Sequence, residues 1–211
     1  MKYNLVTVEG NIGAGKTTLA RKLAKEFNGR LVLEEFENNP FLPSFIQGQK
    51  SKALPTELYF MAERFQQLQQ EIRSYDLSQD RILMDYLFNK SLLFARVNLE
   101  GDEYELFKKL FTIINPQLPK PELLIYVHSE VDRIMHNIRQ RGREFEDGVD
   151  PDYLQRLQDM YFEFLEQQPD MRILVLDCTE ADFVANEEHY REIVEIVSSE
   201  YESGTHSFKI G

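Results

Sequence analysis

Residues 1–23, MKYNLVTVEGNIGAGKTTLARKL, decide the fold of this 211-residue chain. The stretch opens with an apolar run that predicts a buried strand, passes through a glycine-rich loop, and enters a helix that begins Lys16, Thr17, Thr18. Glycines let such a loop fold tightly with its N–H groups pointing inward, where the helix N-terminus adds positive potential. The pattern is typical of a phosphate-binding loop. Its expected residues are Gly10, Asn11, Ile12, Gly13, Ala14, Gly15, Lys16, Thr17 and Thr18.

This loop predicts a magnesium-bound nucleoside triphosphate. In this pattern the ammonium of Lys16 meets the β and γ phosphates, and the hydroxyl of Thr17 is a ligand of a partly hydrated Mg²⁺. The implied ligand is MgATP or MgGTP. The alternative is a glycine turn that feeds an ordinary helix with a surface lysine. It is weak, because the full motif seldom arises by chance between a strand and a helix.

The composition favours one domain over residues 1–211. A hydrophobic content of 42% lets a chain of this length bury one substantial core. No run of about 18 apolar residues predicts a membrane span, and the N-terminal residues form core strand rather than a signal peptide, so we expect a cytoplasmic protein. Cys178 is the only cysteine, which excludes an intramolecular disulfide and favours a core position at a strand end.

The net charge restricts the partners. At −12 the chain repels a nucleic-acid backbone and disfavours an anionic membrane surface, so we expect small-molecule or protein partners. A polyanionic substrate requires positive charge to be concentrated locally. The sequence offers Lys16 together with Arg139, Arg141 and Arg143.

Short apolar runs that alternate with helical stretches predict an α/β fold of the P-loop NTPase type, a three-layer sandwich with a five-stranded parallel sheet. After the first strand, the strands are expected at 31–33, 82–84, 123–127 and 173–176. Helices are expected at 15–27, 54–74, 87–99, 102–114, 130–141, 151–167 and 187–199. Residues 203–211 show no periodicity and are expected to form a loose tail.

An acidic residue, Glu34, follows the second predicted strand. The carboxyl edge of a doubly wound sheet faces the ligand crevice, so a carboxylate there can take a proton from an attacking hydroxyl. Glu35 and Glu37 compete for this role, and without the phosphate loop the cluster would be interpreted as surface acid.

A second acidic residue, Asp85, closes the third predicted strand. In phosphate-loop proteins a carboxylate at this place holds magnesium, directly or through water, opposite the loop hydroxyl. Capping of the next helix is the alternative role, and the two are compatible.

Three arginines lie around Gly142 in NIRQRGREFEDG, residues 137–148, and predict an arginine-bearing lid. Arg141 and Arg143 can close over the phosphates and neutralise charge in the phosphoryl transition state. A basic helix end capped by glycine is the alternative; it accounts for Arg139 but not for Arg143.

The helix predicted at 54–74 carries Glu57 and Arg64 beside its apolar stripe. Seven residues apart, they share one edge of the helix at a separation of about 10 Å, which allows both to line one pocket. The alternative is a solvated flank.

Together these features resemble the deoxynucleoside kinases, most closely the bacterial deoxyadenosine/deoxyguanosine kinase branch. The resemblance is carried by EGNIGAGKTT, the acids after strands two and three, RGR followed by an acid and DPDYL, and LDCTEADF, and it spans nearly the whole chain. It implies transfer of the ATP γ-phosphate to the 5′-hydroxyl of a deoxynucleoside, more often a purine, by a homodimer on a parallel sheet.

The resemblance also implies residue roles. Glu34 matches the family's general base, Asp85 its magnesium-associated acid, and Arg141 and Arg143 its lid arginines. The matches on the acceptor side are Glu146 for the sugar 3′-hydroxyl, Phe94 for base stacking, Arg64 for base contact, and Glu57 at the place of a base-reading glutamine.

Three departures concern the acceptor side. Tyr86 stands where the family has an arginine that helps to hold the 5′-oxygen and phosphate. Ile46 stands where a tyrosine assists the 3′-hydroxyl glutamate, and the region of Lys90 lacks a base-reading aspartate. The sequence therefore leaves two alternatives open, a kinase for another hydroxymethyl acceptor such as a pterin alcohol, and a catalytically impaired nucleotide-binding regulatory protein.

The side chain of Glu57 favours one kind of acceptor. An ionised glutamate at position 57 offers only hydrogen-bond acceptors, which suit the adjacent N1–H and 2-amino donors of guanine. Deoxyguanosine or another guanine-like acceptor is therefore the expected substrate. The alternative is that Arg64 neutralises Glu57 in a purely structural pair.

Overall fold

The computed structural model describes residues 1–35, 38–73, 81–143 and 148–211. Within these residues the chain forms one six-stranded sheet in the order β2-β3-β1-β4-β5-β6, with every neighbouring pair parallel. Its strands are β1 (Leu5–Gly10), β2 (Arg30–Val32), β3 (Ile82–Met84), β4 (Leu123–His128), β5 (Arg172–Asp177) and β6 (Gly204–Lys209). The predicted three-layer α/β sandwich is confirmed.

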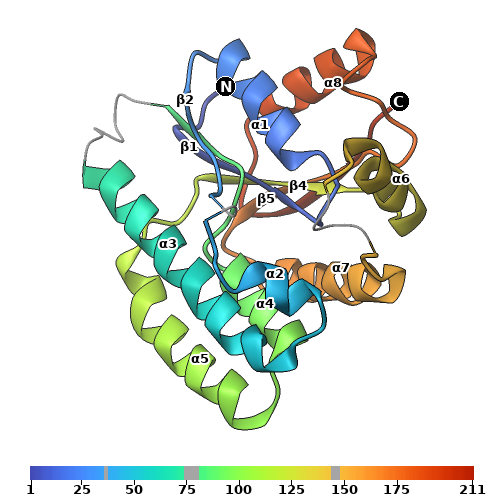
Figure 1. Ribbon diagram of the computed structural model, residues 1–211. Coiled ribbons are helices and arrows are strands. Elements are labelled where there is room, and N and C mark those ends of the chain that lie inside the picture. The colour runs from blue at the N-terminus through green and yellow to red at the C-terminus, as the bar shows by residue number, and fades with distance from the viewer. Residues whose placement is uncertain (36–37, 74–80, 144–147) are drawn as a thin grey trace.

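Helices cover both faces of this sheet. In Figure 1, α1 (Lys16–Glu26) and α8 (Glu187–Ser198) lie above the sheet, and α3 (Ala53–Arg73), α4 (Lys90–Asn98), α5 (Gly101–Ile114) and α7 (Pro151–Glu166) lie below it. The short α2 (Leu42–Ile46) lies beside α3, and α6 (Val131–Arg141) lies at the end of the sheet where the β1–α1 loop turns. None of the helices in the described ranges is long and apolar enough to cross a membrane.

The prediction of five strands and a loose tail was wrong, because residues 204–209 add β6 beside β5. This edge strand has no apolar run: its residues alternate between exposed and half-buried positions, and only Phe208 among them is strongly apolar. Ile210, just beyond it, is fully buried in the core between the sheet and the upper helices. An edge strand with one solvated face gives a weak sequence signal.

The other strands and α-helices lie within a few residues of their predicted bounds, except α2, which was not predicted; two short 3-10 helices, η1 (Lys50–Lys52) and η2 (Asn115–Gln117), were not predicted either. This helix has five residues and no buried side chain, so it carries no periodicity to detect. The lone cysteine, Cys178, is buried directly after β5, as expected.

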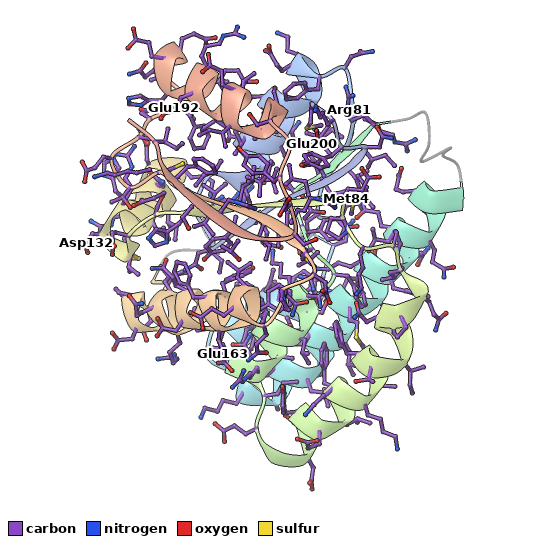
Figure 2. The ribbon with its side chains drawn as sticks, turned by 180° about the vertical axis from the view of Figure 1, so that it is seen from behind. Arg81, Met84, Asp132, Glu163, Glu192 and Glu200 are labelled. Atoms are coloured by element: carbon purple, nitrogen blue, oxygen red, sulfur yellow. The ribbon has the colours of Figure 1, made fainter. Side chains whose placement is uncertain are left out.

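The strand order places the phosphate loop at the centre of the sheet. β1 lies between β3 and β4, so the chain order changes direction at β1, and ligands bind in open α/β sheets at such a switch point beyond the carboxyl ends of the strands. Seen from behind, Glu163 lies on α7 below the sheet and Glu192 on α8 above it, with Asp132 on α6 (Figure 2). Acidic side chains thus lie on several outer helices.

Candidate functional site

The loop between β1 and α1 is held in place by hydrogen bonds within the protein. Asn11 is buried; its Nδ2 donates to the carbonyl of Leu154 on α7 at 2.8 Å, and its Oδ1 accepts from the N–H of Ile12 at 2.8 Å. Asn137 on α6 donates to the carbonyl of Gly13 at 3.0 Å. The loop is therefore tied to both α6 and α7 before any ligand binds.

Two glycines of the loop have no room for a side chain. A Cβ on Gly13 would lie 2.8 Å from Cγ1 of Ile138 on α6, and a Cβ on Gly15 would lie 2.9 Å from Cζ of Phe183. Both have positive φ, 81° and 92°, where side chains are disfavoured. Gly15 precedes the first turn of α1, whose free N–H groups can receive an anion.

Lys16 begins α1, and its Nζ donates to the carbonyl of Asn11 at 3.4 Å. Burial lowers the pKa of Lys16 to about 8, and the positive charge of Lys90 acts in the same direction. A phosphate beside this ammonium would favour its charged form. The ammonium of Lys16 thus lies against the backbone of the loop.

A chain of hydrogen bonds joins three predicted site residues. The hydroxyl of Thr17 donates to Oδ2 of Asp85 at 2.6 Å, and Oδ1 of Asp85 accepts from the backbone N–H of Glu34 at 2.7 Å. Asp85 thus connects the phosphate loop on β1 with the end of β2. The two acids come together because the carboxyl ends of neighbouring parallel strands meet at one edge of the sheet.

The oxygens of Thr17 and Asp85 fit a magnesium ion. Mg²⁺ keeps several waters and takes one or two protein oxygens together with those of a nucleotide. In the described ranges no group of three or more His, Cys, Asp or Glu side chains is placed to hold a metal. A magnesium bound here would depend on this hydroxyl and carboxylate, on water and on the nucleotide.

The carboxylate of Glu34 is held by two cations. Oε1 accepts from Nε of Arg64 at 2.8 Å and lies 2.6 Å from its Nη2, while Oε2 accepts from Nζ of Lys90. The Nη1 group of Arg64 donates to Oγ of Ser91 at 2.8 Å. Burial alone would raise the pKa of Glu34, but Lys90 and Arg64 outweigh it and hold the pKa well below its usual value. The carboxylate is ionised and fixed in orientation. Of its two rivals, Glu35 is exposed and Glu37 lies outside the described residues.

Glu57 on α3 is buried, at 2% exposed. Its Oε1 accepts from Nδ2 of Asn98 on α4 at 2.7 Å, whereas its Oε2 has no hydrogen-bond partner in the described structure. The hydrogen bonds of Arg64 go to Glu34 and Ser91, so Arg64 does not pair with Glu57. Burial raises the pKa of Glu57 to about 7. The structure thus holds a buried carboxyl oxygen that a ligand could satisfy.

The other predicted residues lie on α2, on α4 and at the end of α6, or outside the described residues. Phe94 is half-buried on α4, one turn after Lys90, and its ring centroid is 5.3 Å from Nζ of Lys90. Ile46 ends α2 at 39% exposure. Arg141 is the exposed last residue of α6, Gly142 ends the helix in a left-handed conformation, and the half-buried Arg143 follows. The lid therefore remains a prediction. Glu146 lies outside the described residues.

Sequence reasoning missed several residues of the site. Lys90 and Ser91 open α4, and nothing in the local pattern sets this buried lysine apart from a surface one. Glu9 is buried beneath the loop, where it accepts from the N–H of Leu87 and the hydroxyl of Tyr161, and burial raises its pKa. An acid inside the apolar first strand was a signal that could have been used.

Comparisons with known proteins identify the family of this chain. A family model described as Deoxynucleoside kinase matches residues 6–201. Deoxyguanosine kinase from Bacillus subtilis (strain 168) is 31% identical over 192 residues, covering 89% of this chain and 93% of that protein. Deoxyadenosine kinase from Dictyostelium discoideum is 33% identical over 200 residues, covering 94% of this chain and 79% of that protein.

The fold also matches solved structures. The structure of deoxyadenosine kinase from M. mycoides with bound dATP superposes with a TM-score of 0.79 at 22% identity, covering 92% of this chain and 98% of that one. At this identity the likeness supports the fold alone. Because the family model spans most of the chain and the two relatives match along most of its length, the chain belongs to the deoxynucleoside kinase family and is a phosphotransferase.

Proposed function

We propose that this kinase transfers the γ-phosphoryl group of ATP to the 5′-hydroxyl of a deoxynucleoside, and that its preferred acceptor is a purine, deoxyguanosine. The proposal depends most on the hydrogen-bonded chain from Thr17 through Asp85 to the backbone of Glu34. These hydrogen bonds set the carboxylate of Asp85, and the residue Glu34 next to it, beside the loop expected to hold the nucleotide. Phosphoryl transfer needs such positioning and charge more than covalent chemistry.

The assigned roles follow from the contacts. Lys16 and the loop N–H groups would hold the β and γ phosphates, and Thr17 with Asp85 would hold a magnesium ion, which neutralises phosphate charge when bound. Glu34 is the general base: it is ionised and anchored, and it lies at the sheet edge where ligands bind. Arg141 and Arg143 are proposed to add charge over the phosphates.

The guanine preference is drawn from Glu57. An ionised carboxylate offers acceptors only, and guanine presents two adjacent donors, N1–H and the 2-amino group. The unsatisfied Oε2 and the lone-pair site left on Oε1 could receive both. Adenine and cytosine would set an acceptor against an acceptor, and such a buried mismatch discriminates by up to about 10⁴-fold. Relatives carry both deoxyguanosine and deoxyadenosine kinase names, so membership of the family does not decide the acceptor. The preference is therefore argued from Glu57 alone.

The test is an acceptor panel with MgATP: four deoxynucleosides, their ribose counterparts and a pterin alcohol. We expect deoxyguanosine to give the highest kcat/KM. A preference for the pterin alcohol, which offers the same pair of donors as guanine, would make this a kinase for another hydroxymethyl compound. Tight ATP binding with no active acceptor would instead favour the regulatory alternative.

The base assignment has a matched control next to it in the chain. Glu34→Gln should lower kcat by roughly 10²- to 10⁴-fold, the usual range for losing a general base, with little change in ATP affinity. Glu35→Gln removes the charge of an exposed neighbour and should leave kcat close to that of the wild type. A reversed order would move the base by one residue.

A further inference from the structure

Lys90 lies where a lysine is least expected. It is the first residue of α4, and it is only 5% exposed. The N-terminus of a helix carries partial positive charge, which disfavours a cation there, and a buried ammonium must replace its lost water with other partners. Both the helix dipole and burial disfavour a lysine at this position, so its presence points to a role in function.

The ammonium of Lys90 has one hydrogen-bond acceptor among the described residues, Oε2 of Glu34. Its side chain also runs beside the ring of Phe94, with Nζ 5.3 Å from the ring centroid. Among the described residues, the hydrogen bonding of Lys90 is therefore directed at Glu34.

The two oxygens of Glu34 differ in what they can still accept. Arg64 approaches Oε1 with Nε at 2.8 Å and with Nη2 at 2.6 Å. A carboxylate oxygen has about two lone-pair sites, so Oε1 is filled. Oε2 receives only Lys90 and keeps one site open. A proton that leaves an acceptor hydroxyl therefore has one open destination on this carboxylate, the oxygen that Lys90 holds.

We propose that Lys90 is a positioning residue for phosphoryl transfer, which acts with Arg64 to lock the Glu34 carboxylate so that Oε2 receives the acceptor proton. This inference rests on the assignment of Glu34 as the general base in the proposed function. In the step, the 5′-hydroxyl proton passes to Oε2, and the bond from the 5′-oxygen to the γ-phosphorus forms. The bond from that phosphorus to the β–γ bridging oxygen breaks, and its electron pair leaves with ADP. Lys90 takes no part in the proton transfer itself; it holds Oε2 in place.

A double-mutant cycle tests whether Lys90 acts through Glu34. Lys90→Met removes the donor while keeping most of the length of the side chain, and it should lower kcat by about 10- to 100-fold, the range expected for losing a hydrogen bond to a charged group. KM for ATP should stay within about twofold. In a Glu34→Gln background the same change should lower kcat by less than about threefold, because the interaction is already lost.

Two further variants keep the test decisive. Lys90→Arg keeps charge and donors, so it should recover turnover to within about tenfold of the wild type. If the melting temperature of Lys90→Met shows that this variant does not fold, Lys90→Gln replaces it in the double-mutant cycle. The control is Lys108→Met on α5, an exposed lysine, which should leave kcat unchanged.

The outcomes separate the two proposals. An equal loss in both backgrounds would overturn the inference, because Lys90 would then act independently of Glu34. No loss in the wild-type background would overturn it as well. A wild-type protein that phosphorylates no deoxynucleoside would instead remove the proposed function, and the inference with it.

Discussion

If Glu57 reads the base, acceptor preference should change with pH near neutrality. The pKa of Glu57 is raised from 4.5 to about 7, mainly by burial. Above pH 7 the side chain is ionised and offers acceptors only, which suits guanine. Below pH 7 it is protonated and offers one donor and one acceptor, as a glutamine does, which suits adenine. The preference for deoxyguanosine should therefore fall as the pH falls.

The charged groups that face Glu57 come from three directions. Arg64 on its own helix and Lys90 on α4 lower its pKa, while Glu34 beyond β2 raises it. Tyr153 on α7 shares the amide of Asn98 with Glu57, and its own pKa is raised, so it remains neutral over this range. None of these contributions exceeds that of burial, which is the largest cause of the raised pKa.

The size of the effect follows from the ionised fraction. With a pKa of about 7, roughly nine tenths of the protein carries an ionised Glu57 at pH 8 and roughly one tenth at pH 6. If only the ionised form rejects adenine, the ratio of kcat/KM for deoxyguanosine to that for deoxyadenosine should fall about tenfold between pH 8 and pH 6. Taking a ratio cancels pH effects shared by both acceptors, including those on Lys16 and Glu34.

The assay is steady-state kinetics with each nucleoside at saturating MgATP, from pH 6 to pH 8. In Glu57→Gln the ratio should be lower and independent of pH, since an amide does not titrate. Glu63→Gln is the control: it makes the same change on the same helix, less than two turns after Glu57, at a half-buried position outside the site. This variant should keep the pH dependence of the wild-type ratio. A wild-type ratio that stays constant across this range, or an unchanged acceptor order in Glu57→Gln, would refute the reasoning.

Three further predictions concern the activity and the stability of variants at Lys16, Glu57 and Arg143. Lys16→Ala should abolish transfer while the fold survives, because the lysine supplies both positioning and charge at the phosphates; turnover above about a tenth of wild type would contradict this role. Glu57→Gln should stabilise the free protein at pH 8 by up to about 3 kcal/mol, since a pKa raised from 4.5 to about 7 means that folding buries an unfavourable charge. That gain should decline as the pH falls from 7 and vanish below about 4.5, where both states are protonated, and thermal melts at pH 8 and pH 4 check it. Arg143→Ala should slow turnover with less effect on the KM of the acceptor, and a KM increase at unchanged kcat would assign the arginine to acceptor binding instead.

The sequence was sufficient for the features that arise from chain order. The phosphate loop is a local motif, and Glu34 and Asp85 follow apolar strands directly, so parallel pairing of β2 with β3 brings them to one edge. The contacts of Lys90 and Asn98 on α4 could not be predicted in this way. Lys90 and Asn98 reach Glu34 and Glu57 only after α4 packs beside α3, and no spacing along the chain encodes that approach.

The partners of Arg64 show the same limit. Position 64 was expected to contact a base, and its place on the same helix as Glu57 could be worked out from helical periodicity alone. Its hydrogen bonds instead go to Glu34 and Ser91, from two other elements. A base contact by Arg64 stays a prediction, as do the lid and the homodimer that the resemblance implies.

The single carboxylate of Asp85 also bears on how such a kinase can change its acceptor. The elements expected to hold the donor are the β1–α1 loop and α6, whereas Glu57, Arg64 and Phe94, which are assigned to the acceptor, belong to α3 and α4, the helices that lie below the sheet (Figure 1). Within the described residues, Asp85 accepts one hydrogen bond from Thr17 on the loop side and one from the backbone N–H of Glu34 after β2. The carboxylate of Glu34 is held in turn by Arg64 of α3 and Lys90 of α4. Substitutions elsewhere on α3 and α4 can therefore accumulate without disturbing the loop, provided that Asp85, Arg64 and Lys90 stay in place. New acceptor specificities are accordingly expected to arise from those two helices, with the ATP half of the protein inherited intact.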